Sequence, residues 1–109
     1  MVVPNVYSLM VNSKISRSTD QVSTELQGDA VILNVKTGKY FNLNSVGSHI
    51  WKLLEEPKSM LSIVEAILSE YDVERARCEE DVFNVLRKLQ LAGLVEIASE
   101  SPDPSEDGR

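Results

Sequence analysis

The spacing of the apolar residues changes once along this chain, at about residue 44, and this change limits what the chain can fold into. Before it, apolar side chains alternate with polar ones or form short β-branched runs, which is typical of strands. After it, they recur every three or four residues, which is typical of helices that bury one face. Strands followed by helices favour an α+β fold, in which a layer of helices covers an antiparallel sheet.

Three strands are predicted, and glycine marks the turns between them. Gly28 separates the first two and Gly38 the next two, and glycine readily adopts the positive φ of tight turns. The middle run is apolar on both faces, so we expect it to pair on both sides and to be covered by helices. The strands are expected at residues 22–26, 30–35 and 39–43.

Three helices are predicted after the strands, and their ends carry capping residues. Asn44 and Ser59 can cap the first two, the first helix ends before Pro57, and Gly93 can end the third. A short run at 94–97 favours a strand. These elements indicate a small domain of winged-helix type, with a three-stranded antiparallel sheet packed on three helices.

The chain has room for one domain. Its 109 residues are 42% hydrophobic and 26% charged, an ordinary composition that supports a single modest core. Residues 1–19 are polar and rich in serine, so we expect a mobile N-terminal arm that can lend one short strand. Residues 99–109 contain no hydrophobic side chain and are expected to form a disordered acidic tail. The folded domain is therefore predicted over residues 20–98.

The residues that could carry chemistry do not form a catalytic or metal-binding set. His49 is the only histidine and Cys78 the only cysteine; Cys78 lies in phase with the apolar stripe of its helix, as a buried side chain would. The acidic run 79–81 suits the positive end of a helix dipole. It does not suggest a cation site, because three adjacent carboxylates on a helix point in three directions. The glycines are isolated, so there is no phosphate-binding loop. The sequence predicts no enzyme, no metal and no cofactor.

The charge distribution limits the partners. The net charge is −6, and the surplus of acidic residues lies beyond residue 60, which disfavours nucleic acid. No apolar run approaches the roughly 18 residues of a membrane span, and a lone cysteine fits the reducing cytoplasm. We therefore expect neither nucleic acid nor a membrane as partner. An acidic winged-helix regulator that binds DNA as a dimer remains the alternative.

The predicted sheet offers a binding edge. With the strands in sequence order, residues 39–43 form an edge strand, whose unpaired backbone groups can take up an extended peptide. Strand alternation puts Tyr40 and Phe41 on opposite faces. The sequence does not decide which of these two side chains faces such a peptide.

A peptide at this edge also needs an apolar wall, and the third helix can supply one. Phe83 and Leu86 are its candidate apolar residues. The polar rim would consist of Asn84, Arg87 and Gln90. The alternative for Phe83 is packing beneath the C-terminal tail.

The sequence resembles the PqqD-like family over about residues 20–97. The segments that carry the resemblance are 30–54 (AVILNVKTGKYFNLNSVGSHIWKLL), 71–73, 81–82 and 89–95. Its most specific residues are Leu43, Asn44, Gly47, Ile50 and Trp51.

The resemblance implies a noncatalytic winged-helix domain that recognises the precursors of ribosomally made, modified peptides. Such domains hold the leader segment of the precursor as an added strand between the third strand and the third helix. Segments 38–44 and 79–82 look most like the leader-binding protein of lasso-peptide pathways. That likeness implies two further partners, a cysteine-protease leader peptidase and a macrolactam-forming cyclase. The alternative is the peptide chaperone of the pyrroloquinoline quinone pathway, which serves a radical enzyme.

The same resemblance implies which residues form the site. The backbone of the edge strand would pair with the leader, and residues of the third helix would line or rim the helical wall. The peptide-binding residues so implied are Lys39, Tyr40, Phe41, Asn42, Leu43, Cys78, Val82, Phe83, Leu86 and Arg87.

Overall fold

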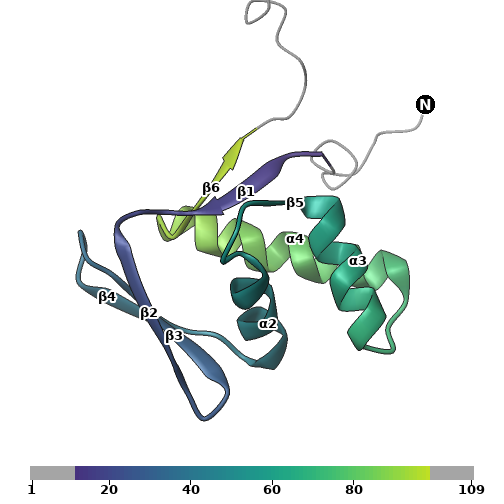
Figure 1. Ribbon diagram of the computed structural model, residues 1–109, viewed down its shortest axis with the longest axis horizontal. Helices are drawn as coiled ribbons and strands as arrows, with labels where there is room; N and C mark the ends of the chain where they lie inside the picture. The colour runs from purple at the N-terminus through teal and green to yellow at the C-terminus, as the bar shows by residue number, and fades with distance from the viewer. Residues whose placement is uncertain (1–11, 99–109) are drawn as a thin grey trace, which may run out of the picture.

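The structure, a computed structural model, describes residues 12–98; the predicted acidic tail and the first eleven residues of the predicted arm lie outside this range. Two small sheets and three helices make up the described part (Figure 1). The strands are β1 (Lys14–Arg17), β2 (Gln21–Leu26), β3 (Asp29–Asn34), β4 (Lys39–Asn42), β5 (Lys58–Ser59) and β6 (Val95–Ala98). The helices are α2 (Ser45–Leu53), α3 (Met60–Glu70) and α4 (Arg75–Leu91).

β2, β3 and β4 form the antiparallel meander predicted from the sequence, with β3 in the centre. Leu26 pairs with Asp29, so the turn between β2 and β3 has two central residues, Gln27 and Gly28, with φ of 56° and 90°. Positive φ at both positions matches the twist of the flanking strands. Gly38, in the second turn, has a φ of 75°. The predicted strands and their order are confirmed.

The three predicted helices are present, with the expected caps. The side chain of Asn44 accepts a hydrogen bond from the N–H of Gly47 at 2.8 Å, and that of Ser59 accepts one from Ser62 at 3.1 Å. Gly93, just after α4, has a φ of 76°, a conformation that glycine adopts without a Cβ penalty. The sequence therefore predicted the positions of the helices, the residues that cap the starts of α2 and α3, and the glycine that ends α4.

A second sheet, with the strand order β5-β1-β6, is the main departure from the prediction. The run predicted at 94–97 forms β6, and the short strand expected from the arm is β1. However, β1 is the central strand of its sheet, and its Ile15 is fully buried. The prediction of a mobile arm up to residue 19 is wrong for β1, because two strand partners and a buried side chain fix it in the fold.

Arg17, the last residue of β1, joins this sheet to α2. Its guanidinium lies over the ring of Trp51, 4.2 Å from the centroid, and donates to the Trp51 carbonyl at 2.6 Å. The indole Nε1 of Trp51 in turn donates to Ser23 Oγ of β2 at 3.0 Å. Burial lowers the pKa of Arg17, although a guanidinium remains charged at neutral pH. These contacts hold β1, β2 and α2 together.

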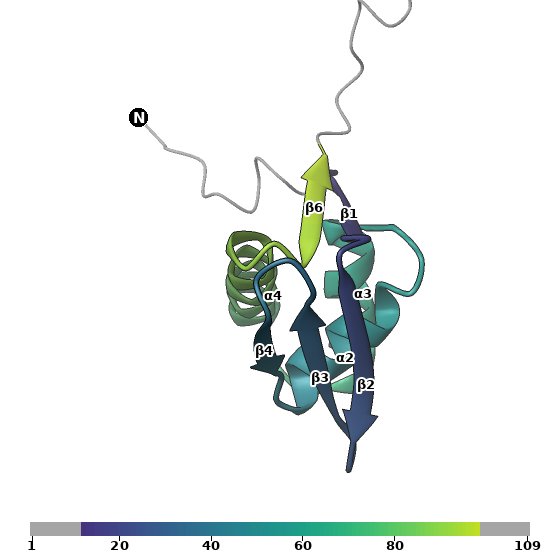
Figure 2. The same ribbon diagram turned by 90° about the vertical axis from the view of Figure 1, so that its left-hand side faces the viewer.

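The helices cover only one face of the β2-β3-β4 sheet, as Figure 2 shows. Ala30, Ile32 and Asn34 of β3 are buried on that face, whereas Val31 and Leu33 on the opposite face are only partly buried. The middle strand is thus paired on both sides, as expected, and the helices form a single layer over one of its faces. We call the uncovered side the outer face. Its apolar residues are Val22, Leu26, Val31, Leu33, Val35 and Tyr40.

Candidate peptide-binding site

β4 is an edge strand, and its pairing with β3 determines which of its backbone groups are free. The N–H of Leu43 donates to the carbonyl of Ala30 at 3.0 Å, so these two residues form a hydrogen-bonded pair. In an antiparallel ladder such pairs alternate with pairs that exchange no hydrogen bonds. Tyr40 and Asn42 belong to the second kind. Their two N–H donors and two C=O acceptors therefore point to the free edge.

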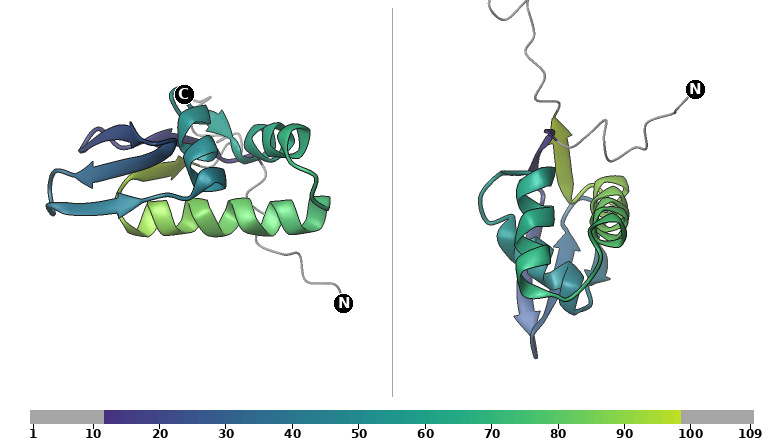
Figure 3. Two further views of the ribbon diagram at one scale, coloured as in Figure 1. Left: turned by 90° about the horizontal axis from the view of Figure 1, so that it is seen from below. Right: turned by 90° about the vertical axis from the view of Figure 1, so that its right-hand side faces the viewer.

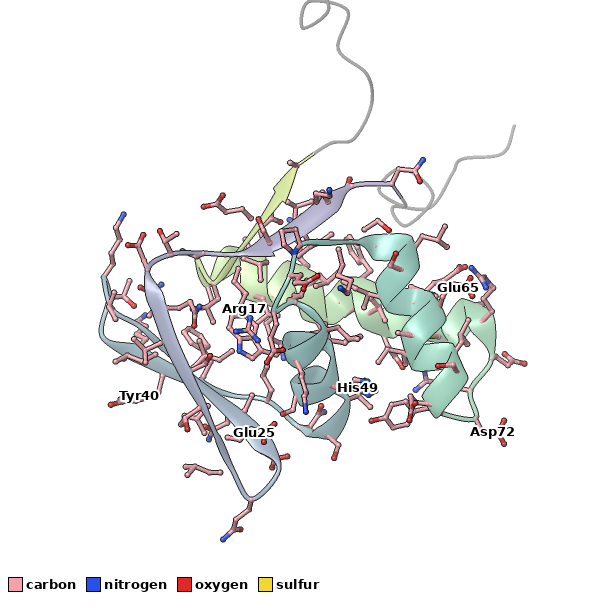
Figure 4. All side chains as sticks on the ribbon, viewed as in Figure 1. Arg17, Glu25, Tyr40, His49, Glu65 and Asp72 are labelled. Atoms are coloured by element: carbon pink, nitrogen blue, oxygen red, sulfur yellow. The ribbon has the colours of Figure 1, made fainter. Side chains whose placement is uncertain are left out.

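The side chains of β4 alternate between the helices and the outer face. Phe41 is partly buried and packs against the core, as does Leu43 just after the strand. Tyr40 is 70% exposed and projects away from the helices (Figure 4). Phe41, and not Tyr40, therefore lies on the side of α4, and which of the two contacts a bound peptide stays a prediction.

α4 runs beside β4, as Figures 2 and 3 show, and one row of its residues faces the sheet. Successive helical residues turn by about 100°, so positions spaced i, i+4, i+7 and i+11 share a face. Asp81 lines a cavity together with Val46 at the start of α2, and the Ala92 carbonyl accepts a hydrogen bond from Asn34 Nδ2 at 2.9 Å. The Asp81 end of the row thus lies towards α2, and the C-terminal end of α4 is hydrogen-bonded to β3. We call this row the sheet-facing flank: Asp81, Val85, Lys88 and Ala92.

Two residues predicted for the helical wall lie elsewhere on α4. Phe83 follows Asp81 by two positions, which turns it by about 200°, to the opposite flank. Arg87 is exposed and turned by about 100° from Lys88. By this geometry Val85 and Lys88 lie nearer the β4 edge than Phe83 and Arg87, whose role at that edge stays a prediction.

The other predicted helical residues are buried, and two of them line a cavity of about 280 Å³ between α2 and α4. Cys78 and Val82 form part of its wall, whereas Leu86 is fully buried in the core and offers no surface. Burial raises the pKa of the Cys78 thiol, and the nearby carboxylate of Asp81 raises it further. The sulfur is therefore a neutral part of a mainly apolar lining. The described residues around the cavity are Val46, Ile67, Tyr71, Asp72, Val73, Cys78, Asp81 and Val82.

The side chain of Asn34 sets the spacing between the meander and α4. Its Nδ2 donates to the Ala92 carbonyl, and its Oδ1 accepts from the N–H of Lys36 at 2.9 Å and of Thr37 at 3.2 Å. One buried amide thus holds both the β3–β4 turn and the end of α4. The sequence alone does not indicate this role, because an asparagine within a strand-like run gives no signal of the residues it will bond to.

A serine fixes the other end of β4. Ser48 Oγ accepts a hydrogen bond from the N–H of Ala30 at 2.7 Å and donates to the carbonyl of Leu43 at 3.1 Å. This hydroxyl of α2 therefore bridges the ends of β3 and β4. Both ends of the edge strand are held by side-chain hydrogen bonds, so its free N–H and C=O groups have fixed positions.

Among residues 12–98, no three His, Cys, Asp or Glu side chains are grouped so that they could hold a metal ion. The His49 ring packs against Tyr71, with centroids 5.9 Å apart and an interplanar angle of 54°. Within the same residues, none of the helices has the length and apolar character needed to cross a membrane. The arrangement offers an open strand edge beside an apolar cavity.

Comparison with known proteins bears on this edge. The sequence profile of the family described as coenzyme PQQ synthesis protein D (PqqD) matches residues 29–95, which is more than half of the chain. The chain belongs to the PqqD family. The family expected from the sequence is thus confirmed, and the matched region of this PqqD-family chain contains β3, β4 and all of α4.

Two solved structures share the fold of this PqqD-family chain. One is TbiB1 in complex with the TbiA(β) leader peptide, which is 41% identical, has a TM-score of 0.71, and is matched over 81% of this chain and 99% of that one. The other is lasso peptide synthetase B1 complexed with the leader peptide, at 24% identity and a TM-score of 0.66, over 75% of this chain and 96% of that one. They confirm the predicted fold class. A comparison with curated protein sequences gives no match.

Proposed function

We propose that this PqqD-family chain binds the leader segment of a ribosomally made precursor peptide, of the lasso class, by β-strand addition to β4, and that it catalyses no reaction itself. The free edge of β4 carries this proposal, because the outward N–H and C=O groups of Tyr40 and Asn42 lie beside the flank of α4. TbiB1, to which the chain is 41% identical, has been solved with a leader peptide. This supports the same class of ligand here.

The bound leader forms the fourth strand of the meander. Its backbone pairs with residues 39–43, and its side chains alternate between the outer face and the side of α4. Those on the inner side lie between Phe41 and Val85. Where the peptide passes the end of β4, the cavity lined by Cys78 and Val82 takes an apolar side chain.

The proposal includes partners that receive the leader in the cytoplasm, namely a leader peptidase and a macrolactam-forming cyclase. The outer face offers a docking surface: Val22, Leu33 and Tyr40 form one row across the sheet, and Val22 is 61% and Tyr40 70% exposed. Grouped exposed apolar residues of this kind are typical of protein interfaces. We assign the outer face to the peptidase, since a leader strand added at β4 extends the same row.

Titration with the TbiA(β) leader peptide tests the binding function. We expect saturable binding by calorimetry, and shifts of backbone amide signals concentrated in residues 39–43 and on the sheet-facing flank of α4. The leader peptide complexed with lasso peptide synthetase B1 serves as a second probe. If neither peptide binds, or if the shifts avoid both segments, the proposal is wrong.

A variant of the outer face tests the partner separately. Val22 lies on β2, the strand farthest from the binding edge, so Val22→Glu is expected to keep the affinity for the leader. Cleavage of the bound leader by the partner peptidase should fall at least about tenfold, because a carboxylate would be buried in the interface. Thr19→Glu, at an exposed residue outside the sheet, is the control. Equal cleavage with both variants would exclude the outer face as the docking surface.

A further inference from the structure

Two lysines border the binding edge where β4 begins. Lys39, the first residue of β4, has the same strand parity as Phe41, so its side chain leaves the sheet on the side of α4. It pairs with Asn34, the residue that bonds to Ala92 at the end of the sheet-facing flank. Lys88 lies one helical turn before Ala92 on that flank. A peptide added to β4 therefore passes between Lys39 and Lys88.

Neither lysine has an ion-pair partner among residues 12–98. Three other cations of the described chain do have such partners, namely Lys36, Arg75 and Arg77; Lys36 pairs with Asp20 and Arg77 with Asp81, both at 3.5 Å. Lys39 and Lys88 are exposed, and both carry a positive charge at neutral pH. A carboxylate between the two ammonium groups would be attracted by both.

The opposite end of the flank is acidic. Asp72 and Asp81 lie at the cavity, and Asp81 precedes Lys88 by seven helical residues, a rise of about 10.5 Å. This distance corresponds to about three residues of an extended peptide. The path beside β4 thus has two carboxylates at the cavity, of which that of Asp81 is paired with Arg77, and two ammonium groups at the β3–β4 turn. An acidic peptide residue is favoured at the turn and repelled at the cavity.

The geometry points to Lys39 and Lys88 as a joint site for an acidic side chain of the bound peptide, whose position fixes the register of the peptide on β4. This inference rests on the proposed function and adds the charge of the ligand and two residues that read it. The apolar cavity alone would accept an apolar side chain from a peptide that runs in either direction along β4. The charges along α4 favour the placement that puts an acidic peptide residue at the β3–β4 turn over the placement that puts it at the cavity.

Selection from a peptide library tests the inference without knowledge of the natural leader. Random displayed peptides of roughly twelve residues, long enough to span β4 and the cavity at about 3.3 Å per residue, are selected on the full chain. The same library is selected on Lys39→Glu, Lys88→Glu and the control Arg87→Glu. Arg87 is also exposed but turned away from the flank. All three substitutions change exposed side chains, so the fold is retained.

We expect the wild type and Arg87→Glu to enrich peptides with Asp or Glu at one fixed position relative to an apolar residue. Lys88→Glu and Lys39→Glu should lose this preference or favour Lys or Arg there. An enriched acidic peptide should bind Lys88→Glu at least about fivefold more weakly than the wild type. The displayed peptides have no free C-terminus, so a side-chain carboxylate is what the selection reports.

The failure of this inference can be told apart from the failure of the proposed function. If the wild type binds the TbiA(β) leader peptide and enriches peptides without an acidic position, the lysine site is refuted and strand addition stands. The same holds if Arg87→Glu loses the preference as fully as Lys88→Glu does. If the wild type neither enriches peptides nor binds the leader, the proposed function itself is refuted.

Discussion

A proline at residue 42 tests the strand edge most directly. The N–H of Asn42 points away from β3 and makes no bond in the ladder, so proline removes a group that only an added strand would use. Proline is tolerated on edge strands at such positions, and it requires the preceding residue, Phe41, to be extended, as it already is. The Asn42→Pro protein is therefore expected to fold.

The size of the effect follows from the count of free groups. Tyr40 and Asn42 together offer two N–H and two C=O groups to a peptide, and Asn42→Pro removes one donor. One net hydrogen bond contributes about 0.5–1.5 kcal/mol, and the ring also occupies the place of the incoming carbonyl. Since about 1.4 kcal/mol corresponds to a factor of ten, we expect binding to weaken about tenfold.

Fluorescence anisotropy of labelled TbiA(β) leader peptide measures this change, with circular dichroism to check folding. Asn42→Ala is the matched control, because it removes the side chain and keeps the N–H, and it should bind like the wild type. A folded Asn42→Pro protein with wild-type affinity would refute strand addition at this residue. Equal losses for Asn42→Ala and Asn42→Pro would assign the effect to the side chain.

Four further predictions concern the wall, the spacing and the thiol. Val85→Asp should weaken leader binding about tenfold in the same assay, whereas Phe83→Asp, on the opposite flank, should lower thermal stability and leave the affinity unchanged. Gly93→Ala should lower the melting temperature by roughly 4–8 °C for about 1 kcal/mol, because its φ is 76° and a Cβ would lie 3.1 Å from Asn34 Nδ2. Asn34→Ala should destabilise by about 1–3 kcal/mol in urea unfolding, since the Ala92 carbonyl loses its partner. Because burial raises the pKa of Cys78, less thiolate is present at pH 8, and alkylation by iodoacetamide should be slower in the native than in the urea-unfolded chain.

Local pattern was sufficient to predict the meander and the helices. The switch of period, the caps Asn44 and Ser59 and the turn glycines are signals within a few residues, and each lies where it was expected. β1 was underestimated because its short run has one fully buried apolar residue, Ile15, and its partners β5 and β6 are distant in the sequence. Pairing of that kind leaves no local period to detect.

The edge strand of the candidate site was predictable and its helical wall was not. Residues 39–43 followed from strand order alone. The choice between the two flanks of α4 depends on where the helix crosses the meander, and sequence gives only the angle between residues. Phe83 and Val85 both border the buried stripe of α4. Phe83 was predicted for the helical wall because its side chain is the larger of the two. The positions of Asp81 at the cavity and of Ala92 beside Asn34 favour Val85.

Strand addition, if the chain acts as we propose, also explains how it reports its ligand to a partner enzyme. The alternation that separates Phe41 from Tyr40 divides the leader side chains into two sets. One set is held against α4, and the other continues the row of Val22, Leu33 and Tyr40 on the outer face. On our proposal, a peptidase docked on that face contacts a wider apolar surface when the leader is present, so it is expected to bind the loaded domain more tightly than the empty one. By thermodynamic reciprocity, the docked peptidase must raise the affinity for the leader by the same factor.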